Sequence, residues 1–136
     1  MSTQPELDTL MQQCAADAVQ FAAEEYQINL DFSLESLLLV DSLLSRLHEV
    51  NRLQRFSDEH MFTLCNIFAA YVGQIFINVV GGEWIHQKAD ETAPYVSLNY
   101  NNREFPLASL CYHKISKDHN LSVRDYISKA MSNVMQ

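Results

Sequence analysis

Three side chains in the second half of the sequence are of the types that bind zinc. His86 falls in a predicted strand, and Cys111 and His113 fall within and just after a predicted extended segment of the same sheet. A zinc site needs three or four such ligands that converge at bonding distance. The spacing is loose here, and the sequence contains neither an HExxH nor a CxxC motif. Surface histidines are common, so the sequence predicts no metal and no cofactor.

Cys111, His113 and Asp118 also supply the residue types of nucleophilic catalysis. In such a site a base activates the thiol and a carboxylate orients the base. No nucleophile-elbow motif accompanies these residues, and a lone cysteine in a predicted strand is typical of a protein core. The three glycines, two of them adjacent, cannot form a phosphate-binding loop. The sequence therefore favours a protein without catalytic activity, although it leaves an enzyme open.

Three carboxylates near the start of the second predicted helix could take part in acid–base chemistry. Asp31, Glu35 and Asp41 would do so if burial separated their pKa values. Glu35 is expected in the first helical turn, where the helix dipole favours an anion, and Asp41 is expected at the edge of the apolar face. Helix capping and solvation are therefore the simpler interpretation of all three.

A cluster of aromatic and polar residues predicts a place for a small molecule. Tyr71 and Gln74 lie in the predicted third helix, and Trp84 and His86 lie in the strand that follows it. These side chains could line a pocket between helix 61–80 and the sheet. Large aromatic residues at such positions also fit an ordinary packed core. A small-molecule-binding protein or an enzyme with this pocket is kept as the alternative hypothesis.

Negative charge is concentrated in the first half of the chain. Residues 1–60 hold eleven Asp and Glu against three Arg, whereas residues 61–136 hold six acids and six bases. The net charge of −8 therefore belongs to the first half. Such a field repels nucleic acid and anionic membranes and favours a basic protein partner, although an acidic surface can also serve solubility alone. The predicted contact residues are Glu24, Glu25, Glu49, Asp58 and Glu59.

Helical spacing and caps predict the elements that position these residues in the first half. Three helices are expected over about 5–26, 34–53 and 58–80. Ser33 and Ser57 are the expected N-caps of the second and third helices. Gly81-Gly82 is expected to end the third helix, and Gly73 within it indicates the close approach of another backbone. The segment 27–32 is a connector or a brief strand.

After residue 82 the periodicity changes from that of helices to that of strands. Extended segments are expected over 83–87, 95–100 and 104–112, with turns at 88–94 and 101–103 and a last helix over 122–135. Pro106 places the start of the third segment at a sheet edge or a bulge. The order predicts an α+β fold with three N-terminal helices, a three-stranded antiparallel meander and a C-terminal helix. The length of 136 residues fits a single domain over 1–136.

The cysteines and the N-terminus predict the compartment. Three cysteines, an odd number without a close pair, indicate a reducing environment. The first residues lack the basic and apolar regions of a signal peptide. Residues 61–80 are almost apolar enough to span a membrane, but polar residues interrupt them and no basic cluster flanks them. The sequence therefore predicts a soluble, cytoplasmic protein that binds neither membranes nor nucleic acid.

Several segments resemble a widespread family of small uncharacterised bacterial cytoplasmic proteins. They are LDFSLESL at 30–37 with Val40, Asp41 and Leu44 beyond it, AYVGQI at 70–75, GGEW at 81–84, and a strand–Asn–Pro segment over 98–106. The resemblance covers roughly 28–130, and the motifs are structural in type. Relatives often carry an acidic residue where Gln74 stands. The resemblance implies no established activity or cofactor, and small acidic proteins of this kind are often immunity partners of bacterial toxins.

These observations together favour a non-catalytic cytoplasmic binding protein. The leading hypothesis is an immunity protein whose acidic residues mask a basic site on a toxin. A homodimer is compatible with it, because excess apolar surface on the first or third helix could bind a second copy.

Overall fold

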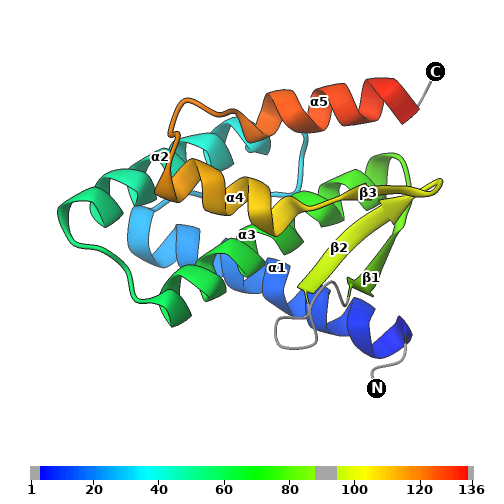
Figure 1. The fold of residues 1–136 in the computed structure, drawn as a ribbon, viewed down its shortest axis with the longest axis horizontal. Helices are drawn as coiled ribbons and strands as arrows, with labels where there is room; N and C mark the ends of the chain where they lie inside the picture. The colour runs from blue at the N-terminus through cyan, green and yellow to red at the C-terminus, as the bar shows by residue number, and fades with distance from the viewer. Residues whose placement is uncertain (1–3, 88–94, 135–136) are drawn as a thin grey trace.

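The computed structural model describes residues 4–87 and 95–134 and has an α+β fold, as predicted (Figure 1). The predicted turn at 88–94 and the predicted helix end at Met135 lie outside these residues. The elements in chain order are α1 (Gln4–Tyr26), α2 (Ser36–Leu53), α3 (Asp58–Val79), β1 (Glu83–Gln87), β2 (Tyr95–Tyr100), β3 (Arg103–Phe105), α4 (Leu107–Ser116) and α5 (Val123–Val134).

The centre of the fold is α3, which packs against α1 and α4 (Figure 1). Twelve of its residues are buried. The helices α1 and α3 run in opposite directions (Figure 1). Gln4 at the start of α1 donates a hydrogen bond to the carbonyl of Trp84, which follows the end of α3, and Phe21 near the end of α1 packs edge-on against Phe68 in the middle of α3. By length and composition α3 could cross a membrane, but most of it is buried in this protein, and the core helix of a globular domain has the same character.

Both ends of α3 have the caps that the sequence predicts. The hydroxyl of Ser57 accepts a hydrogen bond from the His60 amide at 3.1 Å, and Asp58 and Glu59 occupy the first turn, where the helix dipole favours anions. At the other end the chain turns through Gly81 and Gly82 at φ +118° and +116°. A side chain would be strained at these angles, so the two glycines end the helix.

Gly73 allows a close approach within α3, but its neighbour is a side chain and not a backbone. A Cβ atom on Gly73 would lie 2.0 Å from Cη2 of Trp84 on β1. The indole therefore lies directly on the helix, and its Nε1 donates a hydrogen bond to Oε1 of Gln74 at 3.0 Å. This contact fixes the sheet against α3.

The three strands form the predicted antiparallel meander, in the order β1–β2–β3. Trp84 pairs with Leu98, and Leu98 pairs with Phe105, so these buried side chains share the face of the sheet that packs on the core. Asn101 and Asn102 turn the chain between β2 and β3 at φ 55° and 66°. Asparagine tolerates this left-handed conformation, which confirms the predicted turn.

The prediction of an extended segment over 104–112 is wrong beyond Phe105. The strand β3 ends there, and α4 begins after Pro106. One face of α4 is buried with helical spacing: Leu107, Leu110, Cys111, Lys114 and Ile115. The C-terminal part of the fold therefore has two helices, α4 and α5, and α5 packs outside α2 (Figure 1).

The predicted start of the second helix is two residues early, and 27–32 contains no strand. Residues 33–35 form a turn, and α2 begins at Ser36. Ser33 nevertheless acts as a cap, because its hydroxyl accepts a hydrogen bond from the Ser36 amide at 3.2 Å. Ser122 likewise caps α5 as predicted, accepting from the Asp125 amide at 3.0 Å.

Candidate functional site

The structure does not bring the predicted zinc ligands together. His86 is exposed on β1, whereas Cys111 is fully buried in α4. His113 follows Cys111 by two residues on the same helix, so it points to a different, exposed side. No group of three or more His, Cys, Asp or Glu within residues 4–87 and 95–134 is arranged to hold a metal ion.

Burial also makes Cys111 a poor nucleophile. The desolvated environment raises the pKa of its thiol far above the usual value, and burial raises the pKa of Cys65 to about 12. Only the thiolate is nucleophilic. Cys14, which is partly exposed on α1, has a pKa raised first by burial and then by the charge of Asp17. The Cys111–His113–Asp118 arrangement therefore cannot activate a thiol.

This burial predicts the order in which the thiols react. With iodoacetamide near pH 8, Cys14 is expected to be modified first in the folded protein, and Cys65 and Cys111 only when it unfolds. A rise in pKa from 9.0 to about 12 lowers the thiolate fraction of Cys65 about a thousandfold. Peptide mass spectrometry of a time course measures the three rates. In denaturant the three should react alike, and modification of Cys111 as fast as Cys14 in the folded protein would contradict the buried environment.

The three predicted carboxylates at the start of α2 have separate structural roles. Asp31 accepts hydrogen bonds from the side chain and the amide of Ser33, and these lower the pKa of Asp31. Glu35 is exposed in the turn before α2. Asp41 binds residues far along the chain. It accepts hydrogen bonds from the Ser122 hydroxyl at 3.0 Å and the Val123 amide at 2.7 Å. The three are therefore not a catalytic pair or triad.

Asp41 belongs to a buried polar network that no sequence pattern predicted. The Lys114 side chain is almost completely buried, and its Nζ lies 3.7 Å from Oδ1 of Asp41. The same ammonium donates hydrogen bonds to the carbonyls of His119 at 2.6 Å and Leu121 at 2.5 Å. The network joins α2, α4 and the first turn of α5. Its groups are bound to each other and to backbone, which is typical of a structural network.

The predicted pocket between α3 and the sheet is occupied by its own predicted lining residues. Tyr71 and Trp84 are 0% and 2% exposed. The Tyr71 hydroxyl accepts a hydrogen bond from the Phe32 amide at 2.9 Å and shares another with the Ser36 hydroxyl at 2.6 Å. It thereby holds the turn before α2, and burial raises its pKa. Gln74 and Trp84 also border a polar surface hollow of about 270 Å³ beside the start of α1.

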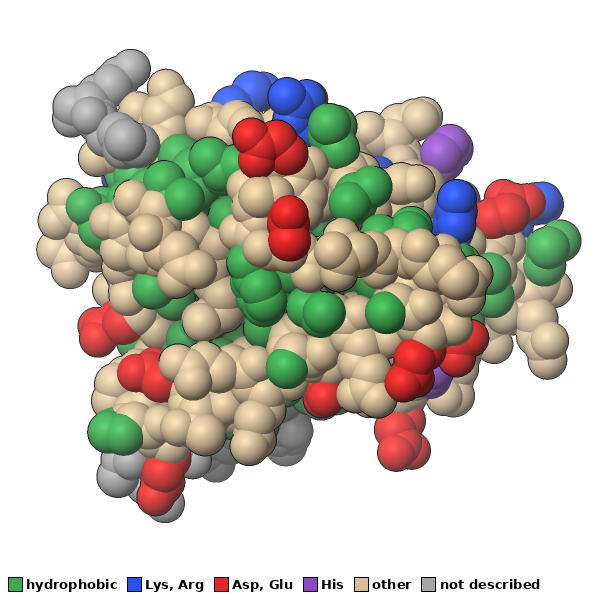
Figure 2. Space-filling view, turned by 180° about the vertical axis from the view of Figure 1, so that it is seen from behind, with side chains coloured by type: hydrophobic (Ala, Val, Ile, Leu, Met, Phe, Trp, Pro, Cys, Tyr) green, Lys and Arg blue, Asp and Glu red, His purple; other side chains and the backbone are tan. Residues whose placement is uncertain are grey.

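The five acidic residues predicted to contact a partner are all exposed: Glu24, Glu25, Glu49, Asp58 and Glu59. They lie at the end of α1, the end of α2 and the start of α3, three helix ends that are all at the left of Figure 1. We call this region the acidic end. Arginines lie among them, and the guanidinium of Arg52 hydrogen-bonds Glu49 and lowers the pKa of that carboxyl. Figure 2 shows other acidic side chains scattered over the opposite view, so the acidity is not one continuous patch.

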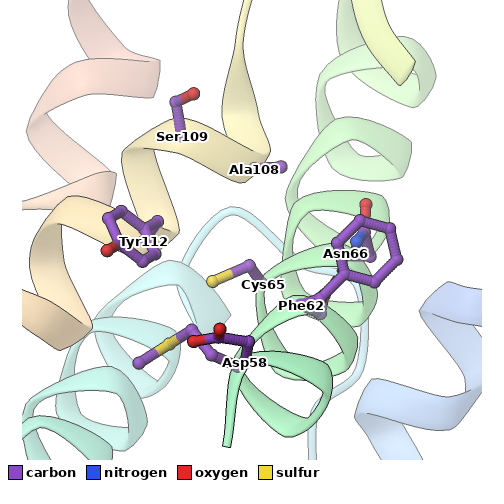
Figure 3. A pocket seen from close by; sticks show the side chains of 8 residues that line it. Asp58, Phe62, Cys65, Asn66, Ala108, Ser109 and Tyr112 are labelled. Atoms are coloured by element: carbon purple, nitrogen blue, oxygen red, sulfur yellow. Dashed lines mark hydrogen bonds between the residues drawn. The ribbon is translucent and has the colours of Figure 1, made fainter. Parts of the chain in front are cut away.

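A hollow of about 350 Å³ lies between α3 and α4, where the sequence predicted none (Figure 3). We call it the apolar hollow. Phe62 of α3 and Tyr112 of α4 stand on opposite sides, with Cys65 between them. Phe62 is 66% exposed and Tyr112 is 42% exposed. The remaining lining residues are Asp58, Met61, Asn66, Ala108 and Ser109.

A second hollow of about 440 Å³ adjoins the first and shares Asp58, Met61 and Tyr112 with it. We call it the basic hollow, because three of the nine Lys and Arg of the chain line it: Arg52, Arg55 and Lys117. The sequence could have indicated both hollows only if α4 had been recognised as a helix. Tyr112 then falls four residues after Ala108, which places both on one helical face.

Comparison of the chain with protein-family models, curated proteins and solved structures found no match. The candidate binding surfaces among the described residues are the acidic end and the two adjoining hollows.

Proposed function

We propose that this is a non-catalytic cytoplasmic binding protein that contacts a partner with a basic surface through its acidic end. The observation that carries the proposal is that five exposed carboxylates come from three helix ends on the same side of the fold (Figure 1). The resemblance to small bacterial cytoplasmic proteins leads us to propose an immunity protein that masks a toxin. The three cysteines are free thiols, which is compatible with a reducing compartment.

The composition of the acidic end supports contact with a protein. Leu53, at the last position of α2, is 74% exposed beside the Glu49–Arg52 ion pair. Arginine is enriched at protein interfaces, in which an apolar centre is surrounded by a polar rim. Rim carboxylates attract a basic partner at long range, so association should be fast and should weaken with salt.

The test compares two variants that each remove three exposed carboxylates. The first is Glu24→Gln/Glu25→Gln/Glu59→Gln at the acidic end. The control is Asp17→Asn/Glu35→Gln/Asp125→Asn, whose residues are exposed elsewhere. Immobilised protein is incubated with lysate of the source cells at low and high salt, and any captured partner is then purified for affinity measurements. We expect the first variant to bind the partner roughly tenfold more weakly than the unmodified protein, and the control to bind about equally.

Two results would overturn the proposal. One is a partner that both variants retain equally, because its contact would then lie elsewhere on the surface. The other is the absence of any captured protein at low salt. Light scattering of the protein alone is measured in parallel, so that self-association is not mistaken for partner binding.

A further inference from the structure

We propose that the apolar and basic hollows form one site for an amphipathic carboxylate, with the carboxylate in the basic hollow and the hydrocarbon part between Phe62 and Tyr112. This inference goes beyond the proposed partner contact and does not depend on it. Each hollow has a volume within the range of about 300–1,000 Å³ that small organic ligands occupy. They adjoin each other, because Asp58, Met61 and Tyr112 line both.

The apolar hollow fits the hydrocarbon part of the ligand. Its two aromatic rings stand on opposite sides of the hollow, one from each helix (Figure 3). Met61 and Cys65 are 9% and 5% exposed and form its inner wall. A phenylalanine that is 66% exposed gains from covering by an apolar group, because apolar surface removed from water is stabilised in proportion to its area.

The basic hollow fits an anion. Arg52 lies in the last turn of α2 and Lys117 follows α4. A helix dipole favours a cation at the C-terminal end, so the dipoles alone can explain why these two positions carry cations. Arg55 differs, because it lies two residues before the N-cap of α3, where the dipole disfavours a cation. Neither Arg55 nor Lys117 has a side-chain partner among the residues described. Both can therefore bind a carboxylate, and Arg55 can do so through two N–H groups.

Asp58 orients the ligand. Its charge also determines whether a substitution at this position strengthens or weakens ligand binding. Its carboxylate lines both hollows at their junction and is the one acid among their described lining residues. It repels an anion and would attract a cation. Removal of this charge should therefore strengthen the binding of a carboxylate and weaken the binding of an ammonium group.

The experiment uses three ligands with the same chain: sodium decanoate, decyltrimethylammonium and decanol. Their affinities for the full-length protein are measured by NMR titration below the micelle concentration, at about 0.1 M salt. Decanoate should bind most tightly, with shifts concentrated at Phe62, Cys65 and Tyr112. Arg55→Gln/Lys117→Gln should weaken decanoate about tenfold and leave decanol unchanged. Asp58→Asn should increase the affinity for decanoate about threefold. Phe62→Ser should lower the affinity for both decanoate and decanol.

The matched control is Arg124→Gln/Lys129→Gln, which removes two exposed cations from α5 and should leave decanoate binding unchanged. Circular dichroism confirms that each variant is folded, which is expected because the replaced side chains are exposed. The proposal is overturned if decyltrimethylammonium binds more tightly than decanoate, if Asp58→Asn weakens decanoate, or if the control weakens it as much as Arg55→Gln/Lys117→Gln does. It is also overturned if the shifts spread over the surface. None of these outcomes bears on the acidic-end variants of the partner test.

Discussion

Replacement of Asp41 by alanine is expected to lower the free energy of unfolding by about 3–5 kcal/mol. The Asp41 carboxylate accepts hydrogen bonds from the first two amides of α5 and from Ser122. It also lies beside the buried ammonium of Lys114. Loss of one partner of a buried ion pair leaves the other charge desolvated, and loss of an N-terminal acceptor leaves helix amides without a partner.

Urea unfolding monitored by circular dichroism measures this loss. The matched control is Asp125→Ala, which removes an exposed carboxylate from the first turn of α5. It should lower the free energy of unfolding by about 1 kcal/mol or less. The double variant Asp41→Ala/Lys114→Met should lose less than the sum of the two single losses, because the charges are coupled. An Asp41→Ala variant as stable as Asp125→Ala would show that the network contributes little.

Replacement of Gly73 by alanine is expected to cost about 3 kcal/mol, although alanine is the better helix former by about 1 kcal/mol. The new Cβ would lie 2.0 Å from Trp84 Cη2 and 2.4 Å from Cζ2. Real atoms do not approach so closely, so the indole must leave the helix or the sheet must shift. Either change breaks the hydrogen bond from Trp84 to Gln74.

Trp84 is the only tryptophan, so its fluorescence reports this displacement directly. The buried indole of the unmodified protein should emit at short wavelength, and Gly73→Ala should shift the emission toward the red. In urea unfolding, Gly73→Ala/Trp84→Leu should lose less stability than the sum of the single variants, because the smaller side chain relieves the clash. If Gly73→Ala is neutral or stabilising, the packing of Trp84 on α3 is wrong.

Elements with local signals were predictable from the sequence. Ser57 and Ser122 cap the third and last helices as expected, because each cap needs only an amide three residues away. The double glycine after α3 and the Asn101-Asn102 turn are equally local, since both need residues that tolerate positive φ. The α+β class follows from these signals and from the change of periodicity after residue 82.

The helix α4 was missed because its buried face contains a charged residue. Leu107, Leu110, Cys111 and Ile115 have helical spacing, but Lys114 stands where the same face should be apolar. Its burial depends on acceptors from α2 and from the α4–α5 connection, and local sequence does not show them. Pro106 was also ambiguous, because proline fits both a sheet edge and a helix N-terminus.

The candidate sites show the same limit. Charge counts identified the exposed carboxylates of the acidic end, because charged residues are rarely buried. They did not show that the guanidinium of Arg52 pairs with Glu49. The two hollows depend on the packing of α4 against α3, so they could not be predicted once α4 was taken as a strand. Asp41 was expected at the edge of an apolar face, and its partner at Val123 is 82 residues away.

That separation also has a consequence for synthesis on the ribosome. Asp41 leaves the exit tunnel well before Lys114 and Val123, at a chain growth of about 5–20 residues per second. The helices α1 to α3 can begin to associate while this carboxylate has no partner and remains hydrated. Only the arrival of α4 and the first turn of α5 removes it from water. Burial of Asp41 is therefore a late electrostatic event, in which a residue that leaves the ribosome later neutralises one that leaves it earlier.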